Sequence, residues 1–220
     1  MGYKVKIDDD VIDVEIIYKK IKSLYIRVEN GKLKVSAPIG TSLTFVENTI
    51  LKHKDRLMKQ LNNYHSYYDY RDGGYVYIFH ELYHIRLIDM KKRKCAIHDN
   101  ELYVYHKDIQ KTVELFLKDE LTKYIERRIE YYLKYDFKLN KPQIEIKKYK
   151  GRWGCCYSKE NRVSFNLSLV YLDKYLIDYV IVHELTHFLV PNHSQDFYNE
   201  MGKRLKDYKI RQKRLKGMHV

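Results

Sequence analysis

The sequence is poor in cysteine and contains no long apolar run. Its 220 residues include three cysteines, two of them adjacent, which is too few for a disulfide framework and does not fit the C-x₂-C spacing of a zinc ribbon. No apolar run approaches the 18 or more residues needed to cross a bilayer, and the opening residues MGYKVKIDDD lack the hydrophobic region of a secretory signal. We therefore expect a cytoplasmic protein with no membrane partner.

Repeats and low-complexity linkers are also absent, and the composition is that of a folded protein. Hydrophobic residues make up 45% and aromatic residues 14% of the chain, which excludes a disordered protein. The length suits one compact unit or two small lobes with a real core. No feature of the sequence indicates an oligomeric state.

The metal-binding pattern His-Glu-x-x-His occurs twice, as HELYH at His80–His84 and as HELTH at His183–His187. On a helix, residues i and i+4 lie on one face, so two imidazoles converge on a single ion. On a strand they lie about 13 Å apart, at roughly 3.3 Å per residue, which is too far for shared ligation. The conformation of each copy therefore decides whether it can bind a metal.

The first copy is predicted to lie on a strand. It follows the turn residues Gly73 and Gly74 and lies among Tyr, Val, Ile and Phe. The next histidine is His98, too distant in sequence for a third ligand at short spacing. We expect His80 and His84 to be ordinary side chains of a sheet.

The second copy is predicted to lie on a buried helix. Asp173 is a candidate N-cap, Pro191 ends the helical run, and Ser194 is a candidate N-cap for a last helix to about Leu215. His193 then comes just before that last helix and can supply a third ligand. A buried helix with two histidines and no metal is the alternative. The prediction of a helix rests on an apolar stripe with helical spacing, which consists of Leu172, Leu176, Tyr179, Val180, Val182, Leu185, Phe188 and Leu189.

Three neutral imidazoles and a water make the open tetrahedral zinc site of hydrolases, whereas a structural site has four protein ligands. We expect one Zn²⁺ per chain on His183, His187 and His193, although imidazole also suits other divalent metals. The metal lowers the pKa of its water to roughly 7. Glu184, about 100° around the helix from His183, is predicted to take the proton of that water and return it to the leaving group.

The predicted activity is zinc-dependent hydrolysis of an acyl bond, most simply by a metallopeptidase acting on a peptide. A non-peptide substrate such as a nucleotide remains an alternative, because the site fixes the nucleophile and not the bond attacked. The ligand spacing equals that of the metzincin pattern HExxHxxGxxH, but Val190 occupies the glycine position. A β-branched residue tolerates positive φ badly, so metzincin membership is not expected.

Residues 150–201 resemble the catalytic core of the YgjP-like metal-dependent hydrolases, relatives of the SprT and WLM minimal zinc peptidases. That family typically shows RWGSC, then N-x-x-L, then YVxxHELxHxxxxNHSxxF, and this chain reads RWGCC, NLSL and YVIVHELTHFLVPNHSQDF. A weaker match covers SLYIRVENGKLKVSAP at Ser23–Pro38. The resemblance implies zinc on His183, His187 and His193 with Glu184 as base, and it leaves the substrate poorly fixed.

One residue departs from the family pattern. Cys155 stands where the family has serine, and Cys156 follows at the position of the family cysteine. A hydrogen bond from the serine near the metal would be weaker from a thiol. Thiolate ligation is an alternative, but we expect both cysteines to pack without binding metal.

The predicted fold class is α+β, with two lobes. Residues 1–106 are expected to form a strand-rich lobe with one helix, and residues 107–220 a zincin-like catalytic lobe with a small antiparallel sheet and a buried HExxH helix. The expected elements are a hairpin turn at Glu29–Lys32, a helix from Thr41 or Ser42 to about Asn62, strands between Tyr75 and His106 with a turn at Asp99-Asn100, a helix from Asp108 to Tyr135, and strands at 143–149 and around 162–166.

Substrate contacts are predicted from the resemblance and from position. In zinc peptidases of this architecture, an edge strand before the metal helix pairs with extended substrate. Arg152, Trp153 and Asn166 are our candidates for lining the cleft. A lone tryptophan is more often a core residue, and Arg152 could instead pair with an acidic neighbour.

Basic residues outnumber acidic ones, 42 to 29, which gives a net charge of +13 and a pI near 9.4. The basic runs are Lys91–Lys94, Lys147–Arg152 and the last helix from Lys203 to Lys216. Such a field attracts polyanions, so a nucleic-acid-associated protein with a structural zinc site is the rival hypothesis. Lysine and tyrosine are frequent throughout the chain, however, which indicates a compositional bias and makes nucleic acid a less favoured partner than a peptide.

Overall fold

The computed structural model describes residues 2–29, 31–62, 66–216 and 218, and shows a mixed α+β protein. Contacts divide the chain into two units, Met1–Ser66 and Tyr67–Val220, each with its own hydrophobic core. This division falls earlier than the boundary predicted near residue 107. The difference arises because the strands between residues 75 and 104 share one core with the long helix that follows them.

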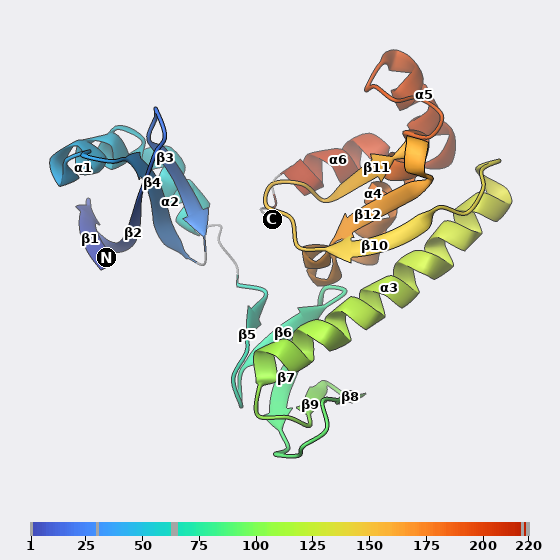
Figure 1. Cartoon of the computed structure of the whole chain (residues 1–220), viewed down its shortest axis with the longest axis horizontal. Coiled ribbons are helices and arrows are strands. Elements are labelled where there is room, and N and C mark those ends of the chain that lie inside the picture. The colour runs from blue at the N-terminus through green and yellow to red at the C-terminus, as the bar shows by residue number, and fades with distance from the viewer. Residues whose placement is uncertain (1, 30, 63–65, 217, 219–220) are drawn as a thin grey trace. The chain divides into compact units, whose positions relative to one another are not determined.

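The first unit is a four-stranded sheet covered on one face by two helices (Figure 1). Its strand order is β1-β2-β4-β3, with β2 and β4 parallel and the other pairs antiparallel. Alternate residues such as Val5, Val14 and Val35 are buried toward the helices. The strands are β1 (Gly2–Ile7), β2 (Asp10–Lys19), β3 (Tyr25–Glu29) and β4 (Lys32–Pro38). Glu29, the last residue of β3, pairs with Lys32, the first residue of β4. Asn30, in the predicted hairpin turn, lies outside the described residues.

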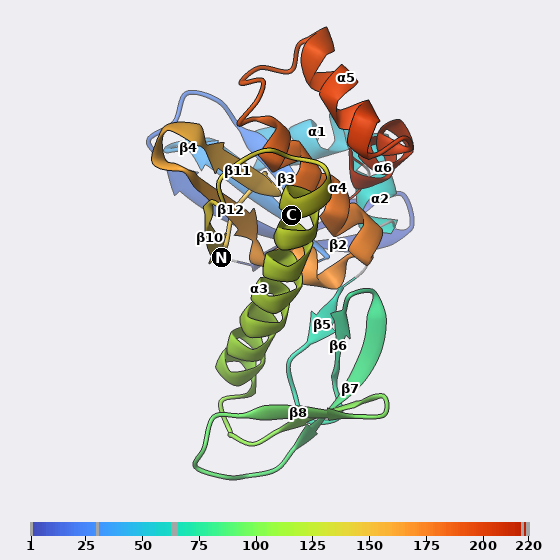
Figure 2. The ribbon, with the colours of Figure 1, turned by 90° about the vertical axis from the view of Figure 1, so that its right-hand side faces the viewer.

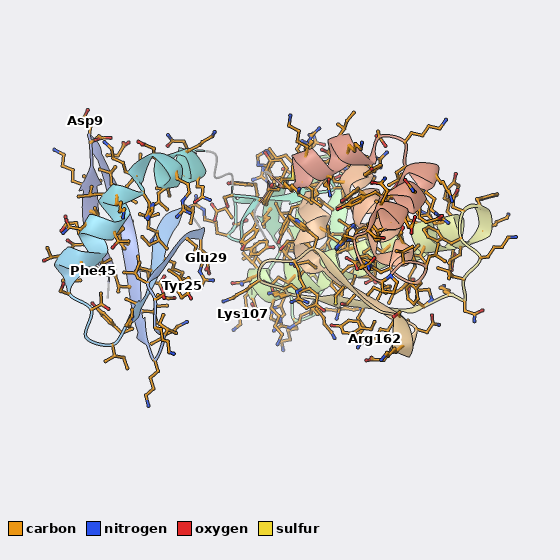
Figure 3. All side chains as sticks on the ribbon, turned by 90° about the horizontal axis from the view of Figure 1, so that it is seen from above. Asp9, Tyr25, Glu29, Phe45, Lys107 and Arg162 are labelled. Atoms are coloured by element: carbon orange, nitrogen blue, oxygen red, sulfur yellow. The ribbon has the colours of Figure 1, made fainter. Side chains whose placement is uncertain are left out.

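The helix predicted from Ser42 to Asn62 is two helices, α1 (Leu43–Lys52) and α2 (Lys54–Asn62). Ser42 is the N-cap as expected, because its Oγ accepts a hydrogen bond from the Phe45 N–H at 3.2 Å. The prediction of one continuous helix is wrong, since His53 leaves the helical conformation at φ −112° and caps α1. Phe45 on α1 and Tyr25 on β3 are exposed (Figure 3).

The second unit begins with a five-stranded sheet in the order β5-β6-β7-β9-β8. The first HExxH copy lies here, and the prediction of a strand holds for His84. It is wrong for His80, which forms the turn of a hairpin with Phe79, at φ of 72° and 52°. Asp99, with φ of 52°, lies in the predicted turn between the last two strands. The strands are β5 (Tyr68–Asp69), β6 (Tyr75–Ile78), β7 (Glu81–Leu87), β8 (Cys95–His98) and β9 (Glu101–Val104).

A long helix, α3 (Ile109–Tyr135), connects this sheet to a second, three-stranded one (Figures 1 and 2). Asp108 caps it, accepting a hydrogen bond from the Lys111 N–H at 3.3 Å. Despite its 27 residues, α3 is not a candidate for crossing a bilayer, and neither is any other described helix.

The three-stranded sheet has the order β10-β12-β11 and is mixed, not antiparallel as predicted. β10 (Gln143–Lys147) and β12 (Arg162–Asn166) are parallel, whereas β11 (Gly154–Tyr157) is antiparallel to β12. The reason is that the chain runs back along β11 before entering β12, so β12 regains the direction of β10. In the order β10-β12-β11, β11 lies at one edge of the described sheet.

The helix α4 (Lys174–Thr186) packs against α3, β11 and the last helices. Its residues between Leu176 and Val182 are almost all buried. Asp173 occupies the N-cap position, but its carboxylate accepts a hydrogen bond from Arg214 at 2.9 Å instead of capping the helix. The single last helix predicted after Ser194 is two, α5 (Gln195–Arg204) and α6 (Tyr208–Lys216), because Leu205 is extended.

α3 and α4 are linked through the carboxylate of Asp178. The guanidinium of Arg128 donates two hydrogen bonds to it, at 2.9 and 2.8 Å, and the hydroxyl of Tyr124 donates a third at 2.8 Å. The side chains of Asp178 and Arg128 are only 13% and 25% exposed. This bidentate pair is therefore partly shielded from solvent, which strengthens it relative to a surface pair.

We expect Asp178→Ala to lower the free energy of unfolding of the second unit by about 2 kcal/mol, because it leaves a half-buried guanidinium without its partner. The matched control is Asp119→Ala, which removes an exposed pair with Lys123 on the same long helix and should change the free energy by at most about 0.5 kcal/mol. Urea denaturation followed by circular dichroism measures both. Equal effects of the two substitutions would contradict the assigned role of Asp178.

Candidate metal centre

The three histidines of the second copy come from the end of α4 and the segment that follows it. His183 lies in the last turn of α4, and His187 is the helix C-cap. The backbone N–H of Val190 still bonds to the Thr186 carbonyl at 2.9 Å, and the chain then bends at Pro191 and Asn192. His193 returns just before α5. The helix end and the turn thus bring three distant ring nitrogens to one point.

The three rings meet closely. One ligand nitrogen from each lies within 4.8 Å of the others, and this is the group of possible metal ligands found among the described residues. The Nε2 atoms of His183 and His193 are 3.1 Å apart. Zinc–nitrogen bonds of 2.0–2.1 Å at a tetrahedral angle separate two ligand nitrogens by about 3.3 Å. The spacing of this pair fits a shared transition-metal ion.

Phe197, in the first turn of α5, holds the rings from one side. Its ring centre lies 4.7–4.9 Å from the ring centres of all three histidines, and it is wholly buried. Our sequence reasoning did not assign it a role. Its position as the phenylalanine of the NHSxxF pattern was the available signal, but that pattern alone does not reveal a contact with three rings.

Burial favours the neutral, metal-binding form of His183 and His187. It lowers the pKa of His183 to about 3, together with the neighbouring rings of His187 and His193. Burial also lowers the pKa of His187. The Nδ1 of His187 lies 3.3 Å from the Val190 carbonyl, which fixes the proton on Nδ1 and leaves Nε2 free as a donor.

The neighbouring cysteines do not join the described ligand group. The Cys155 sulfur lies 3.8 Å from the Arg152 guanidinium, and burial raises the pKa of Cys156 to about 12, so its thiol stays protonated. Three imidazole nitrogens and no thiolate are the donor set of an open zinc site. The residues present fit such an ion.

Glu184 is buried beside the histidines, with 6% of its surface exposed. Burial raises the pKa of this carboxyl to about 8, against the lowering effects of the Cys156 backbone N–H, which bonds to it, and of the Arg152 charge. A divalent cation on the imidazoles would lower that pKa again, because an opposite charge favours the ionised carboxylate.

Gly154 on β11 makes room for this carboxylate. A Cβ atom at position 154 would lie 2.6 Å from Oε1 and 2.8 Å from Cγ of Glu184, closer than real Cβ contacts occur. The glycine is part of the RWGCC motif, but sequence reasoning did not identify it as a site residue. The signal was a glycine in a strand, which often marks a close approach of another group.

A cavity of about 290 Å³ opens beside these residues. Two of the predicted substrate residues, Arg152 and Trp153, line it together with His183 and Glu184. Further lining side chains come from α4 and α6 and were not predicted, since their spacing in sequence carries no signal: Tyr179, Val180, Gln212, Leu215 and Lys216.

Asn166, the third predicted substrate residue, is not among the lining side chains. It is 1% exposed, and its amide donates to the backbone carbonyls of Tyr149 and Arg152 at 3.0 and 2.9 Å. Its own backbone N–H bonds to the Trp153 carbonyl at 2.8 Å. Asn166 therefore fixes the loop that carries Arg152 and Trp153.

Comparison with known proteins identifies one family, and the solved structures that match include two metallopeptidase zymogens. The model of the YgjP-like metallopeptidase domain matches residues 22–218. The metallopeptidase zymogen of Pyrococcus abyssi abylysin is 19% identical with a TM-score of 0.39, over 41% of this chain and 90% of that one. The zymogen of Methanocaldococcus jannaschii jannalysin is 27% identical with a TM-score of 0.37, over 42% and 91%. TM-scores this low do not establish a common fold. No curated protein matches the sequence.

We expect alanine at His183, His187 or His193 to weaken Zn²⁺ binding by at least about 100-fold, because each removes one of three donors. His84→Ala, in the exposed first copy, is the control and should leave the affinity unchanged. Competition with a chromophoric chelator measures the dissociation constants. A loss of affinity in His84→Ala, or full retention in the three other variants, would contradict this assignment.

Proposed function

The chain belongs to the YgjP-like metallopeptidase family, and on that basis we propose that it is a zinc-dependent peptidase. In this proposal His183, His187 and His193 hold one Zn²⁺, and Glu184 is the catalytic base. The observation that carries the proposal is the convergence of three imidazoles next to a buried carboxylate and an open cavity.

Zinc, when bound, acidifies a water molecule and polarises the carbonyl of the substrate. Glu184 accepts the proton of the attacking water and later delivers it to the leaving amine. The environment of the carboxyl supports both roles. Burial favours the protonated acid, whereas a nearby cation favours the carboxylate, so these opposed effects suit a group that takes up and releases a proton.

The backbone of β11 holds Glu184 in this position. The Cys156 N–H bonds to the carboxyl group, and Gly154 lets it approach the strand. Because β11 is an edge strand of the described sheet, an extended peptide can add alongside it, by the β-augmentation used in many peptide complexes. Such a peptide would run past the cavity that Arg152 and Trp153 line.

Glu184→Gln should lower kcat for peptide hydrolysis at least about 100-fold, because an amide cannot accept the proton of water. Zinc content should stay at one ion per chain, since the three imidazoles are unchanged. The measurements are elemental analysis and peptide cleavage followed by mass spectrometry, on zinc-loaded protein. Retained hydrolysis in the variant would rule out Glu184 as the base.

Gly154→Ala should also reduce hydrolysis by about tenfold or more while zinc remains bound, because the added methyl group displaces the Glu184 carboxylate. Gly202→Ala is the matched control. The added methyl group there meets nothing nearer than 3.5 Å, so activity should not change. The test measures the cleavage rate and the zinc content of both variants. Equal activities would show that the contact between Gly154 and Glu184 does not matter for catalysis.

A further inference from the structure

Two cations at the cavity form no ion pair within 4 Å among the residues that the structure describes. Arg152 and Lys216 both line the cavity and are exposed to solvent. The arginines on the same helix as Lys216 are engaged: Arg211 and Arg214 form ion pairs at 2.9 Å. The guanidinium of Arg152 lies 3.8 Å from the Cys155 sulfur and 5.7 Å from the centre of the Tyr149 ring, and its charge also acts on the carboxyl of Glu184.

The rest of the lining is neutral apart from Glu184. Trp153, Val180 and Leu215 are apolar walls, and the latter two are buried. Two cations against one carboxylate give the lining a formal charge of +1 before any metal is counted, from +2 and −1. A volume of about 290 Å³ lies at the low end of the range for ligand pockets. Such a cavity holds a small group with an apolar body and a negative end.

We propose that this cavity receives one substrate residue and that Arg152 and Lys216 bind its carboxylate. The inference rests on the proposed peptidase function and deepens it, because it names the substrate class as peptides with a carboxylate close to the cleaved bond. A guanidinium offers two parallel donors to a carboxylate, and an ammonium adds a point charge. The carboxylate is that of an Asp or Glu side chain or of the peptide C-terminus.

The probes are pools of acetylated hexapeptides that contain Glu, its neutral isostere Gln, or Lys at one position, each made with a free C-terminal carboxylate and with a C-terminal amide. Cleavage by the zinc-loaded protein is followed by mass spectrometry. Binding to zinc-loaded Glu184→Gln is measured for the same pools by calorimetry. We expect one carboxylate position to raise both kcat/KM and affinity about tenfold over its neutral counterpart. The comparison of Glu with Gln tests a side-chain carboxylate, and the comparison of free acid with amide tests the C-terminal carboxylate.

Substitutions then test the two residues. Arg152→Gln and Lys216→Gln should each reduce the preference for the carboxylate severalfold, and Arg152→Glu should reverse it toward peptides with Lys at that position. A change that only disturbs folding cannot reverse a charge preference. The control is Lys213→Gln, an exposed lysine on the same helix that does not line the cavity, and it should leave the preference unchanged.

The outcomes separate this inference from the function itself. If the protein cleaves or binds the Glu and Gln pools equally well, and the acid and amide forms equally well, the carboxylate site is overturned and the peptidase proposal stays intact. An absence of hydrolysis from every pool overturns the peptidase proposal. In that case the binding data on Glu184→Gln still decide whether Arg152 and Lys216 recognise a carboxylate.

Discussion

The carboxylate of Glu184 can lie beside three imidazoles only because the strand opposite carries no side chain at Gly154. This close approach fixes the distance between β11 and α4, and with it the position of the loop before β11. It also buries the carboxylate, which gives it a raised pKa and keeps bulk water from it. A helix and an edge strand packed at this distance therefore create both the environment of the proposed base and one wall of the cavity.

The three proposed metal ligands depend on contacts from a third segment. α4 supplies two imidazoles, and the chain then turns so that His193 and the ring of Phe197 come from the start of α5. The buried ring limits the rotation of the histidines, and the Val190 carbonyl orients one of them. Ligands held by packing and by outer hydrogen bonds need little reorganisation when a metal binds.

Periodicity and spacing predicted most of the elements and separated the two HExxH copies. They worked because a helical or strand conformation follows from local sequence, as at the capped start of α3. The breaks at His53 and Leu205 were missed, since helix formers continue through both positions and tertiary packing decides where each helix ends. The roles of Gly154 and Phe197 depend on contacts between separate segments, which no spacing within one segment reveals.

The central claim is that three imidazoles and no other protein group hold the metal. X-ray absorption spectroscopy of the zinc-loaded protein tests it most directly. The claim predicts about three imidazole nitrogens at 2.0–2.1 Å and one further light atom, with no sulfur. A sulfur scatterer near 2.3 Å, from Cys155 or Cys156, or a fourth imidazole would contradict it, because either would close the position at which a substrate must approach.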